Sequence, residues 1–361
     1  MSRQRIAVIA GDGIGLEVMP AAIECLDDLG ALHGLSLDWN HLEWGSDYYR
    51  AHGRMMPVDG LDVLAKHDAI FLGAVGVPDI PDVETLWGLL IPIRRSFEQY
   101  INLRPVKTLP GVRSILRDER PIDLVIVREN NEGEYSEIGG RMYRGLAQES
   151  AIQESVFTRH GVARAVRFAA ELASRRRGQL TSATKSNGIV HTMPFWDEIV
   201  RETVAGYPDV TLRSELIDAL SANLVLHPWN YDVIVASNLF GDILSDLAGA
   251  VTGSIGSAPS ANLNPEGKHP SMFEPVHGSA PDIAGHGVAN PVGQIWSGAM
   301  MLEALGHPQA AAHLVAAFEA ALGAGVCTRD LGGTHSTADV TSAVRQNIER
   351  RADDFVGVAK S

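Results

Sequence analysis

Short apolar runs alternate with longer amphipathic segments along the chain, and this alternation predicts an α/β protein. The short runs are compact enough to be buried strands, whereas apolar residues in the longer segments recur at helical spacing. Strands are expected at residues 5–10, 35–39, 69–72, 124–127 and 232–236, and helices at residues 16–32, 161–177, 239–250, 291–305 and 308–322. This order favours a mostly parallel sheet covered by helices. The stretch 252–270, rich in Gly, Pro and Ser, is typical of a long loop.

The composition narrows the possible functions. A length of 361 residues suggests about two domains. The 44 acidic residues outnumber the 30 basic ones, and the formal net charge of −14 disfavours non-specific nucleic-acid binding. The two cysteines, Cys25 and Cys327, favour a reducing compartment. No stretch resembles a signal peptide or a membrane span, so we expect a cytoplasmic protein that binds neither nucleic acid nor membrane.

A glycine-rich turn, GDGIG at residues 11–15, joins the first predicted strand to the first predicted helix. In the dinucleotide fingerprint of a Rossmann unit the third glycine follows the second by three residues, whereas here it follows by two. The acidic residues Glu24 and Asp28 fall inside the predicted helix, so neither ends a second strand beside a ribose. The sequence therefore argues against a standard Rossmann fold and favours a tight turn with positive φ.

Three arginines are candidates for binding a carboxylate. Arg128 directly follows a buried apolar run, which places it at the carboxyl edge of the predicted sheet, where α/β proteins bind ligands. Arg104 precedes Pro105, which favours an extended backbone there, and Arg94 follows an apolar helical stretch. A guanidinium group matches a carboxylate in geometry, so the three together would hold a dicarboxylate on this acidic protein. Taken singly, each is better explained as a surface or ion-paired arginine.

Asp242 and Asp246 lie four residues apart in the helix predicted after a strand, and therefore on one helical face. Two carboxylates at this spacing repel each other, and a divalent cation would remove the repulsion. Oxygen ligands favour Mg²⁺ or Mn²⁺ over Zn²⁺. The alternative is that both residues only complement the helix dipole. Asp218, after another apolar run, is a candidate third ligand.

Further side chains suit proton transfer or cofactor binding. Lys185 follows a short predicted strand, and with a lowered pKa it would act as a base; the alternative is a solvated lysine. The hydroxyl of Tyr135 could deliver a proton, although most tyrosines only pack. Asp282 could accept a hydrogen bond from a ribose 2′-hydroxyl, which would favour NAD over NADP.

Taken together, the motifs of this chain resemble those of one family. They are, in chain order, GDGIG, NLRPVK, VRENNEGEYSEIGG, TKSNGIVH, NLFGDILSDLAGAVTGSIGSAPSAN and EPVHGSAPDIAGHGVANP, and they extend over about four-fifths of the sequence. No single motif would be sufficient, but six in register strongly resemble the metal-dependent β-decarboxylating dehydrogenases. Members of that family act on 3-isopropylmalate, isocitrate, homoisocitrate, tartrate or D-malate.

The resemblance implies a two-domain, isopropylmalate-dehydrogenase-like α/β fold with a continuous mixed central sheet flanked by helices. The cofactor-binding domain is expected at residues 1–99 plus 253–361, and the domain for substrate, metal and dimerisation at residues 100–252. An arm at about residues 136–157 would contribute to a homodimer. In the family the residues that match Lys185 and Asp218 reach the site from the neighbouring subunit, so shared active sites are expected.

The resemblance also implies roles for particular residues. The catalytic residues are matched by Tyr135, Lys185 and Asp218, the substrate-binding arginines by Arg94, Arg104 and Arg128, and the metal ligands by Asp218, Asp242 and Asp246. The residues expected to bind the cofactor are Ile14, Asn187, Glu274, His277, Gly278, Ser279, Ala280, Asp282 and Asn290. The implied cofactors are NAD and either Mn²⁺ or Mg²⁺. A requirement for a monovalent cation such as K⁺ is left open.

The residues before Arg94 bear on the substrate. Family members differ there in the pocket for the third substituent of the substrate, which Trp87 and Leu90 are expected to line. No cation stands ready for a third carboxylate, and Trp87 should fill an apolar pocket. Both features favour tartrate or D-malate, and the runs LWGLLIPIRRSFEQY and TKSNGIVHTMPFWDE resemble the members that act on them.

The reaction expected from this resemblance is an NAD-dependent oxidation of a 2-hydroxy dicarboxylate, with β-decarboxylation of D-malate to pyruvate and CO₂. A 3-isopropylmalate dehydrogenase is the alternative within the family. From another class, a Mg²⁺-dependent phosphoryl-transfer enzyme would use Asp242 and Asp246 but would leave the loop at 274–290 without a role. A binding protein without catalytic activity is the third alternative.

Overall fold

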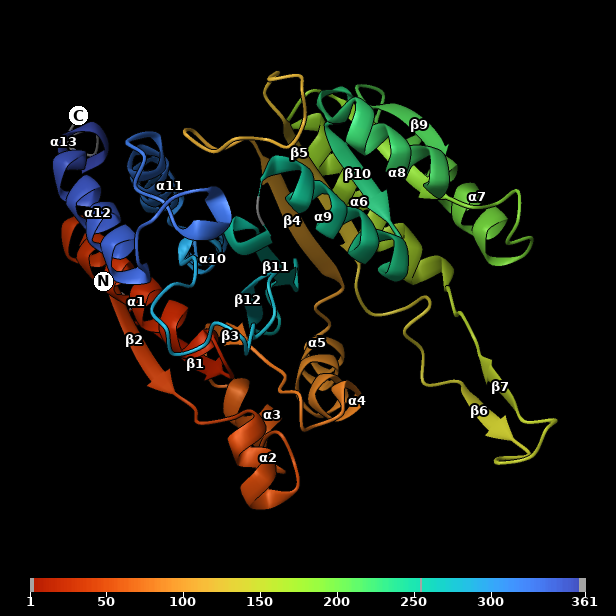
Figure 1. The fold of residues 1–361 in the computed structure, drawn as a ribbon. Coiled ribbons are helices and arrows are strands. Elements are labelled where there is room, and N and C mark those ends of the chain that lie inside the picture. The colour runs from red at the N-terminus through yellow and green to blue at the C-terminus, as the bar shows by residue number, and fades with distance from the viewer. Residues whose placement is uncertain (1–2, 254, 357–361) are drawn as a thin grey trace. The chain divides into compact units, whose positions relative to one another are not determined.

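The computed structural model describes residues 3–253 and 255–356, and these residues form two compact units (Figure 1). The first unit contains residues 1–99, 108–117 and 249–361, and the second contains residues 100–107 and 118–248. Both ends of the chain therefore belong to the first unit. Each unit is an α/β structure with its own run of paired strands.

The first unit has five strands in the order β2-β1-β3-β12-β11. They are β1 (Arg3–Gly11), β2 (Ser36–His41), β3 (Ala69–Ala74), β11 (Pro259–Leu263) and β12 (Ser271–Pro275). The first four in spatial order are parallel, and β11 is antiparallel to β12. β3 is buried along its whole length, which agrees with its continuous apolar sequence.

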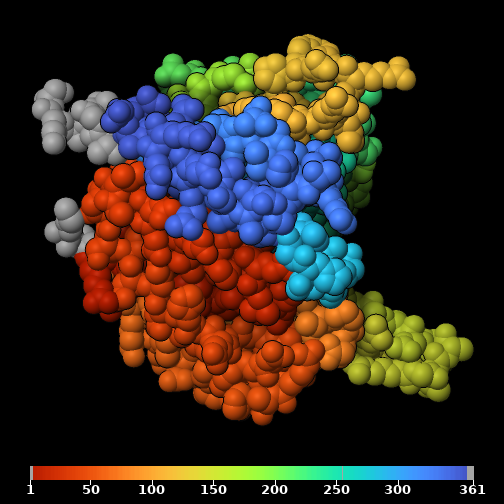
Figure 2. All heavy atoms as spheres, turned by 60° about the vertical axis from the view of Figure 1, so that its left-hand side comes forward, coloured from red at the N-terminus to blue at the C-terminus, as the bar shows by residue number. Residues whose placement is uncertain are grey.

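Helices pack on both faces of this part of the sheet. They are α1 (Gly15–His33), α2 (Ser46–His52), α3 (Gly60–Leu64), α4 (Asp82–Thr85), α5 (Ile91–Ser96), α10 (Val292–Ala304), α11 (Pro308–Gly323), α12 (Thr337–Arg350) and α13 (Ala352–Val356). A single π-helical turn, η1 (Leu86–Leu90), joins α4 to α5. Helices α1 and α10 pack against the strands, and α12 and α13 lie against α1, so the blue helices of the last part of the described chain lie beside the red first segment in Figure 2.

The second unit also has five strands, in the order β4-β5-β10-β8-β9. They are β4 (Ile101–Lys107), β5 (Asp123–Glu129), β8 (Gln179–Thr184), β9 (Thr211–Leu216) and β10 (Val233–Ala236). β4 is antiparallel to β5, and the other pairs are parallel. The helices are α6 (Arg159–Ser174), α7 (Thr192–Val204), α8 (Ile217–Leu226) and α9 (Asn238–Thr252).

A two-stranded hairpin extends from the second unit. Its strands, β6 (Gly139–Met142) and β7 (Ser150–Gln153), are antiparallel and are exposed along their whole length (Figure 1). Large apolar side chains lie open on it, among them Ile138, Tyr143 and Ile152. An isolated hairpin of this size is marginally stable in water, and its apolar side chains favour a covered position.

The ten strands and helices expected from the apolar pattern are confirmed, with ends within three residues of those predicted. The mixed α/β class is also confirmed. The expected loop at 252–270 is wrong in part, because it contains β11, and the sequence of this strand, PSANL, has no β-branched or aromatic residue to reveal it. The segment 108–117, assigned from the sequence to the second domain, lies in the first unit. There Ser114 donates a hydrogen bond to the carbonyl of Val251.

No helix within residues 3–253 and 255–356 has both the length and the hydropathy needed to cross a membrane.

Candidate functional site

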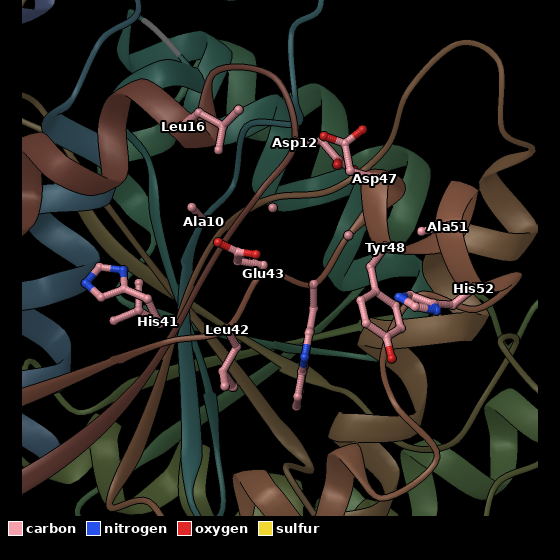
Figure 3. A pocket seen from close by; sticks show the side chains of 14 residues that line it. Ala10, Asp12, Leu16, His41, Leu42, Glu43, Asp47, Tyr48, Ala51 and His52 are labelled. Atoms are coloured by element: carbon pink, nitrogen blue, oxygen red, sulfur yellow. The ribbon is translucent and has the colours of Figure 1, made fainter.

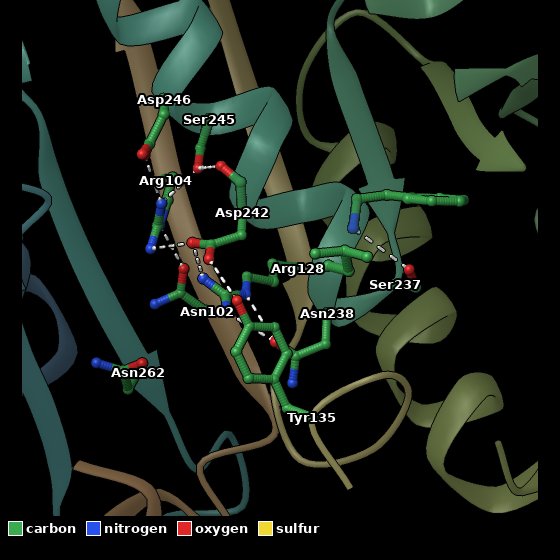
Figure 4. A network of polar contacts seen from close by, with 12 residues as sticks. Asn102, Arg104, Arg128, Tyr135, Ser237, Asn238, Asp242, Ser245, Asp246 and Asn262 are labelled. Atoms are coloured by element: carbon green, nitrogen blue, oxygen red, sulfur yellow. Dashed lines mark hydrogen bonds and ion pairs between the residues drawn. The ribbon is translucent and has the colours of Figure 1, made fainter. Parts of the chain in front are cut away.

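Two arginines and two aspartates meet in the second unit (Figure 4). Arg104 lies on β4 and Arg128 on β5, and the antiparallel register of these strands brings the two side chains to one region. Asp242 and Asp246 lie in the first turns of α9, on the face that points at the arginines. The sequence prediction that the two carboxylates share a helical face is confirmed.

Both arginine side chains are almost fully buried, with exposed fractions of 9% for Arg104 and 4% for Arg128. Arg104 lies 3.3 Å from a carboxylate oxygen of Asp242 and 3.3 Å from one of Asp246. Arg128 donates to the same oxygen of Asp242. The side-chain oxygen of Asn238 accepts from Arg128 at 2.7 Å and 3.1 Å. The cluster thus holds two positive and two negative charges, and burial of the two guanidinium groups strengthens their electrostatic interactions.

The carboxylates of this cluster differ in their surroundings. The side chain of Asp246 is 56% exposed and that of Asp242 is 32% exposed. Partial desolvation raises the pKa of Asp246 from its ordinary value; the guanidinium of Arg104 opposes this shift, and the neighbouring Asp242 adds to it. A divalent cation beside both carboxylates would favour their charged forms. The donor set, carboxylate oxygens on one helical face, suits Mg²⁺ or Mn²⁺.

Tyr135 belongs to the same cluster. Its hydroxyl donates a hydrogen bond of 3.0 Å to Asp242, and the guanidinium of Arg128 lies 5.6 Å from the centre of its ring. The structure therefore brings together five of the residues predicted from the sequence to form the site, namely Arg104, Arg128, Tyr135, Asp242 and Asp246.

Lys185 and Asp218 form a separate pair in the second unit. Lys185 follows the end of β8, Asp218 lies in the first turn of α8, and Nζ of Lys185 lies 2.8 Å from the carboxylate. This hydrogen bond lowers the pKa of Asp218 below its ordinary value. Among residues 3–253 and 255–356, no three His, Cys, Asp or Glu side chains form a group that could hold a metal ion. Asp218 therefore does not join Asp242 and Asp246 within one subunit.

The loop that carries Tyr135 is held by three glutamates that the sequence did not single out. The buried carboxylate of Glu129 accepts from the backbone amides of Asn131 and Glu132, and burial raises its pKa to about 7. Glu132 accepts from the amide and hydroxyl of Thr158 at the start of α6, at 2.7 Å and 2.6 Å. Glu134 accepts from the hydroxyl of Ser237 and from the amide of Leu239 at the start of α9. In sequence, Glu132 and Glu134 look like ordinary surface charge, because their partners are distant in the chain.

In the first unit, the glycine turn meets the loop at 277–290. The amide of Ile14 donates 2.8 Å to the carbonyl oxygen of Ser279. Gly13 has a φ of +54°, and a Cβ added there would lie 2.0 Å from the same oxygen. Only glycine allows this approach. The predicted tight turn with positive φ is thereby confirmed, and two of the sequence motifs expected to bind the cofactor are shown to touch.

Asp12 stabilises this turn through hydrogen bonds with two other segments of the first unit. It is buried, and its carboxylate accepts from the amide and hydroxyl of Ser46 at the start of α2 and from the amide of Gly76. These three hydrogen bonds hold the turn against Ser46 and Gly76, and no sequence pattern predicted them.

Arg94 and Glu274 form an ion pair in the first unit, at 2.8 Å, with side-chain exposures of 12% and 10%. Asn262 donates to the same Glu274 oxygen at 2.7 Å. Nε of Arg94 is buried and makes no hydrogen bond within the part of the chain described. Glu274, predicted to bind the cofactor, is thus placed here as the carboxylate that orients a predicted substrate arginine.

The other predicted cofactor residues are divided between the units. His277, Gly278, Ala280, Asp282 and Asn290 lie in or beside the 277–290 loop, whereas Asn187 is exposed in the second unit, just after β8. Burial lowers the pKa of His277. Asp282 is exposed, and Asn290 donates 2.9 Å to Asp330. The role of each residue in cofactor binding stays a prediction.

Trp87 and Leu90 lie in the π-helical turn η1, and both are partly exposed. The guanidinium of Arg95 is 5.0 Å from the centre of the Trp87 ring. π-Helical turns occur often at functional sites. The prediction that Trp87 fills the pocket for a C3 substituent stays untested by this geometry.

A cavity of about 650 Å³ lies beside the glycine turn of the first unit, at the carboxyl ends of β1 and β2, and Gly11 and Asp12 contribute to its lining (Figure 3). Aromatic rings line it, among them Trp44 and the paired rings of Tyr48 and His52, whose centres are 4.2 Å apart. Glu43 and Asp47 add negative charge. None of the described residues that line this cavity is a lysine or an arginine, so it does not suit a dicarboxylate.

Comparison with known proteins gives concordant matches. A family model described as isocitrate/isopropylmalate dehydrogenase matches residues 5–344. The chain is 52% identical to a probable tartrate dehydrogenase/decarboxylase of Bacillus subtilis (strain 168), over 97% of this chain and 99% of the relative. It is also 52% identical to the D-malate dehydrogenase (decarboxylating) of Escherichia coli (strain K12), over 97% and 100%. The solved isocitrate dehydrogenase from Methylococcus capsulatus is similar, with a TM-score of 0.87, 33% identity, and coverage of 96% and 99%.

Proposed function

The chain belongs to the isocitrate/isopropylmalate dehydrogenase family of oxidoreductases, and we propose that within it this enzyme oxidises tartrate and D-malate with NAD⁺. With D-malate, the reaction continues to pyruvate and CO₂. Membership of a dehydrogenase family removes the phosphoryl-transfer and binding-protein alternatives. A preference for 3-isopropylmalate is the alternative that the experiment below decides.

The observation that carries this proposal is the balanced cluster of Arg104, Arg128, Asp242 and Asp246. A dicarboxylate brings two negative charges and a divalent cation brings two positive ones, so both can enter together without a change in net charge. The arginines would turn from the aspartates to the substrate carboxylates, for which their geometry is suited. The aspartates would then be free to hold the cation.

Asp242 and Asp246 would hold Mn²⁺ or Mg²⁺ together with Asp218 of the partner subunit. Within residues 3–253 and 255–356, Asp242 and Asp246 belong to no group of three possible metal ligands, which supports a site that is completed by another copy. When bound, the ion would polarise the substrate oxygens and stabilise negative charge that develops on them.

Lys185 and Tyr135 would carry out the proton transfers of the reaction. With Asp218 engaged by the metal ion, the neutral form of Lys185 would accept the proton of the 2-hydroxyl group while the hydrogen on C2 leaves with its electron pair for the nicotinamide. Breakage of the bond between C3 and the departing carboxylate leaves its electron pair on the remaining fragment. Tyr135 would then give its proton to C3, a role supported by its position against Asp242.

A homodimer follows from the same proposal. The exposed hairpin β6–β7 suits an arm that pairs with a second copy, because its strands have only each other within the described chain and its apolar side chains lie open. Dimerisation of this kind would also allow Lys185 and Asp218 to serve the site of the partner subunit.

The substrate and cofactor preferences rest on two residues. Trp87 would occupy the space that a branched C3 substituent needs, which favours D-malate and tartrate over 3-isopropylmalate. The exposed carboxylate of Asp282 would accept from a ribose 2′-hydroxyl and repel a 2′-phosphate, which favours NAD over NADP.

The test is steady-state NAD⁺ reduction with Mn²⁺, comparing D-malate, L- and meso-tartrate, 3-isopropylmalate and isocitrate, with CO₂ release followed in parallel. Turnover of D-malate and tartrate above the other substrates is expected. A preference for 3-isopropylmalate would leave the family assignment in place and refute the argument from Trp87. Replacement of NAD⁺ by NADP⁺ in the same assay tests Asp282.

A further inference from the structure

Glu134, the residue directly before Tyr135, contacts the first turn of the helix that carries Asp242 and Asp246. One carboxylate oxygen of Glu134 accepts from the hydroxyl of Ser237 at 2.9 Å, and the other accepts from the backbone amide of Leu239 at 3.1 Å. Both partners lie at the start of α9, in the same unit as Glu134.

The first amides of a helix have no partner within the helix, and a negative charge beside them is favourable. A neighbouring serine or aspartate usually supplies the cap, and here the hydroxyl of Ser237 accepts a long hydrogen bond of 3.5 Å from the amide of Phe240 while it donates to Glu134. The cap of α9 is therefore completed from another part of the chain, because Glu134 accepts from the amide of Leu239, and the segment that carries Glu134 also carries Tyr135.

Glu134 and Tyr135 contact α9 at successive turns. Glu134 holds its start, and the hydroxyl of Tyr135 reaches Asp242 one turn later. Asn238 adds a third tie, because its side-chain amide donates to the carbonyl of Glu132 at 3.2 Å while its oxygen accepts from Arg128. The distance between the tyrosine hydroxyl and the aspartate is thus set by contacts at the helix start.

We propose that Glu134 is a positioning residue that holds the Tyr135 hydroxyl and the carboxylates of α9 in register. The inference rests on the proposed function, since it assigns Tyr135 to proton delivery and Asp242 to the metal. Glu134 is partly buried and shielded from substrate by its two donors, so it acts through Tyr135 and Asp242 and touches no reacting atom.

Two conservative variants distinguish the effect of the side-chain length of Glu134 from the effect of its negative charge. Glu134→Gln keeps the length: its oxygen can accept from Leu239 and its amide group can donate to Ser237. Glu134→Asp keeps the charge but is shorter by one methylene group. If Glu134 acts through the length of its side chain, Glu134→Gln should retain decarboxylation and Glu134→Asp should impair it. If only the negative charge matters, Glu134→Asp should retain decarboxylation and Glu134→Gln should impair it.

Glu132→Asp is the matched control. Glu132 joins the same loop to α6 through Thr158, so the same shortening loosens the loop at a helix that carries none of the proposed site residues and leaves the contacts of Glu134 with α9 in place. All three variants and the unaltered enzyme are compared by the partition of oxaloacetate, the 2-keto acid of D-malate, between decarboxylation and reduction by NADH. Mn²⁺ binding is measured in parallel by electron paramagnetic resonance.

Glu134→Asp should lower decarboxylation relative to reduction about tenfold, as expected for the loss of one helix cap, and should weaken Mn²⁺ binding. Glu134→Gln and Glu132→Asp should leave the partition within about twofold. An unchanged partition in Glu134→Asp, or an equal shift in Glu132→Asp, overturns the inference. If the unaltered enzyme does not decarboxylate oxaloacetate, the proposed function fails instead, and Mn²⁺ binding alone still decides whether Glu134 holds α9.

Discussion

Two variants that are inactive alone should restore activity when mixed, if subunits share their sites. Asp246→Asn removes a carboxylate from α9, and Asp218→Asn removes the acid that is paired with Lys185. Within the described chain these groups do not come together, so the proposed site takes one from each subunit. In a heterodimer, one site then receives both altered residues, and the other site receives neither.

The magnitude follows from this arrangement. Random exchange of equal amounts gives about half heterodimers, each with one intact site of two, so the mixture should regain about a quarter of the unaltered activity. The assay is D-malate-dependent NADH formation after the mixed subunits are dissociated and reassociated, at a Mn²⁺ concentration that half-saturates the unaltered enzyme.

A matched control uses Asp242→Asn mixed with Asp246→Asn. Both residues lie on the same helix, so no combination of subunits produces an intact site, and no recovery is expected. Absence of recovery with Asp218→Asn as well, from a mixture shown to contain heterodimers, would refute the sharing of sites between subunits.

Further predictions concern the proton donor, the glycine turn and the effect of pH. Tyr135→Phe should impair decarboxylation of oxaloacetate more than its reduction, and equal losses would contradict the proposed role. Gly13→Ala should raise the KM for NAD⁺ and cost about 1–3 kcal/mol in the free energy of unfolding, because of strain and a clash with a backbone oxygen. Gly53→Ala, with positive φ but open space, should leave the KM unchanged. Nε2 of His33 lies 2.9 Å from Nδ1 of His313, and burial lowers the pKa of both imidazoles from 6.5. The unfolded chain therefore takes up protons that the folded chain does not, so urea unfolding should show stability falling as pH drops below 6.5; a profile unchanged by His33→Gln would contradict this.

The sequence was sufficient for elements whose own residues determine them. The strands β3, β5 and β10 are continuous apolar runs, and helices such as α6 have a clear apolar face, so each could be predicted locally. β11 could not, because burial of the short segment PSANL depends on pairing with β12 and not on its composition. The π-helical turn η1 was also hidden, since its apolar spacing differs little from that of an α-helix over five residues.

The same distinction applies to the site. The spacing of Asp242 and Asp246 is local, and the sequence placed them on one face correctly. The partners of Glu134 and Glu274 lie far away in the chain, so only the fold reveals that these carboxylates cap a helix and orient an arginine. Residues that act through tertiary contacts have no recognisable spacing in the sequence. Residues that follow a strand can be recognised from the apolar run before them.

The division of the first unit between the two ends of the chain has a consequence for biosynthesis. The second unit is complete once residue 248 has been made, while β3 still lacks its neighbour β12. During translation, the arginines and aspartates would thus be assembled before Gly13 meets the carbonyl of Ser279. A truncated chain ending near residue 250, once released from the ribosome, should resist protease across the second unit and remain sensitive in residues 3–99, so that the surface proposed to bind the nicotinamide cofactor is the last part of the enzyme to form.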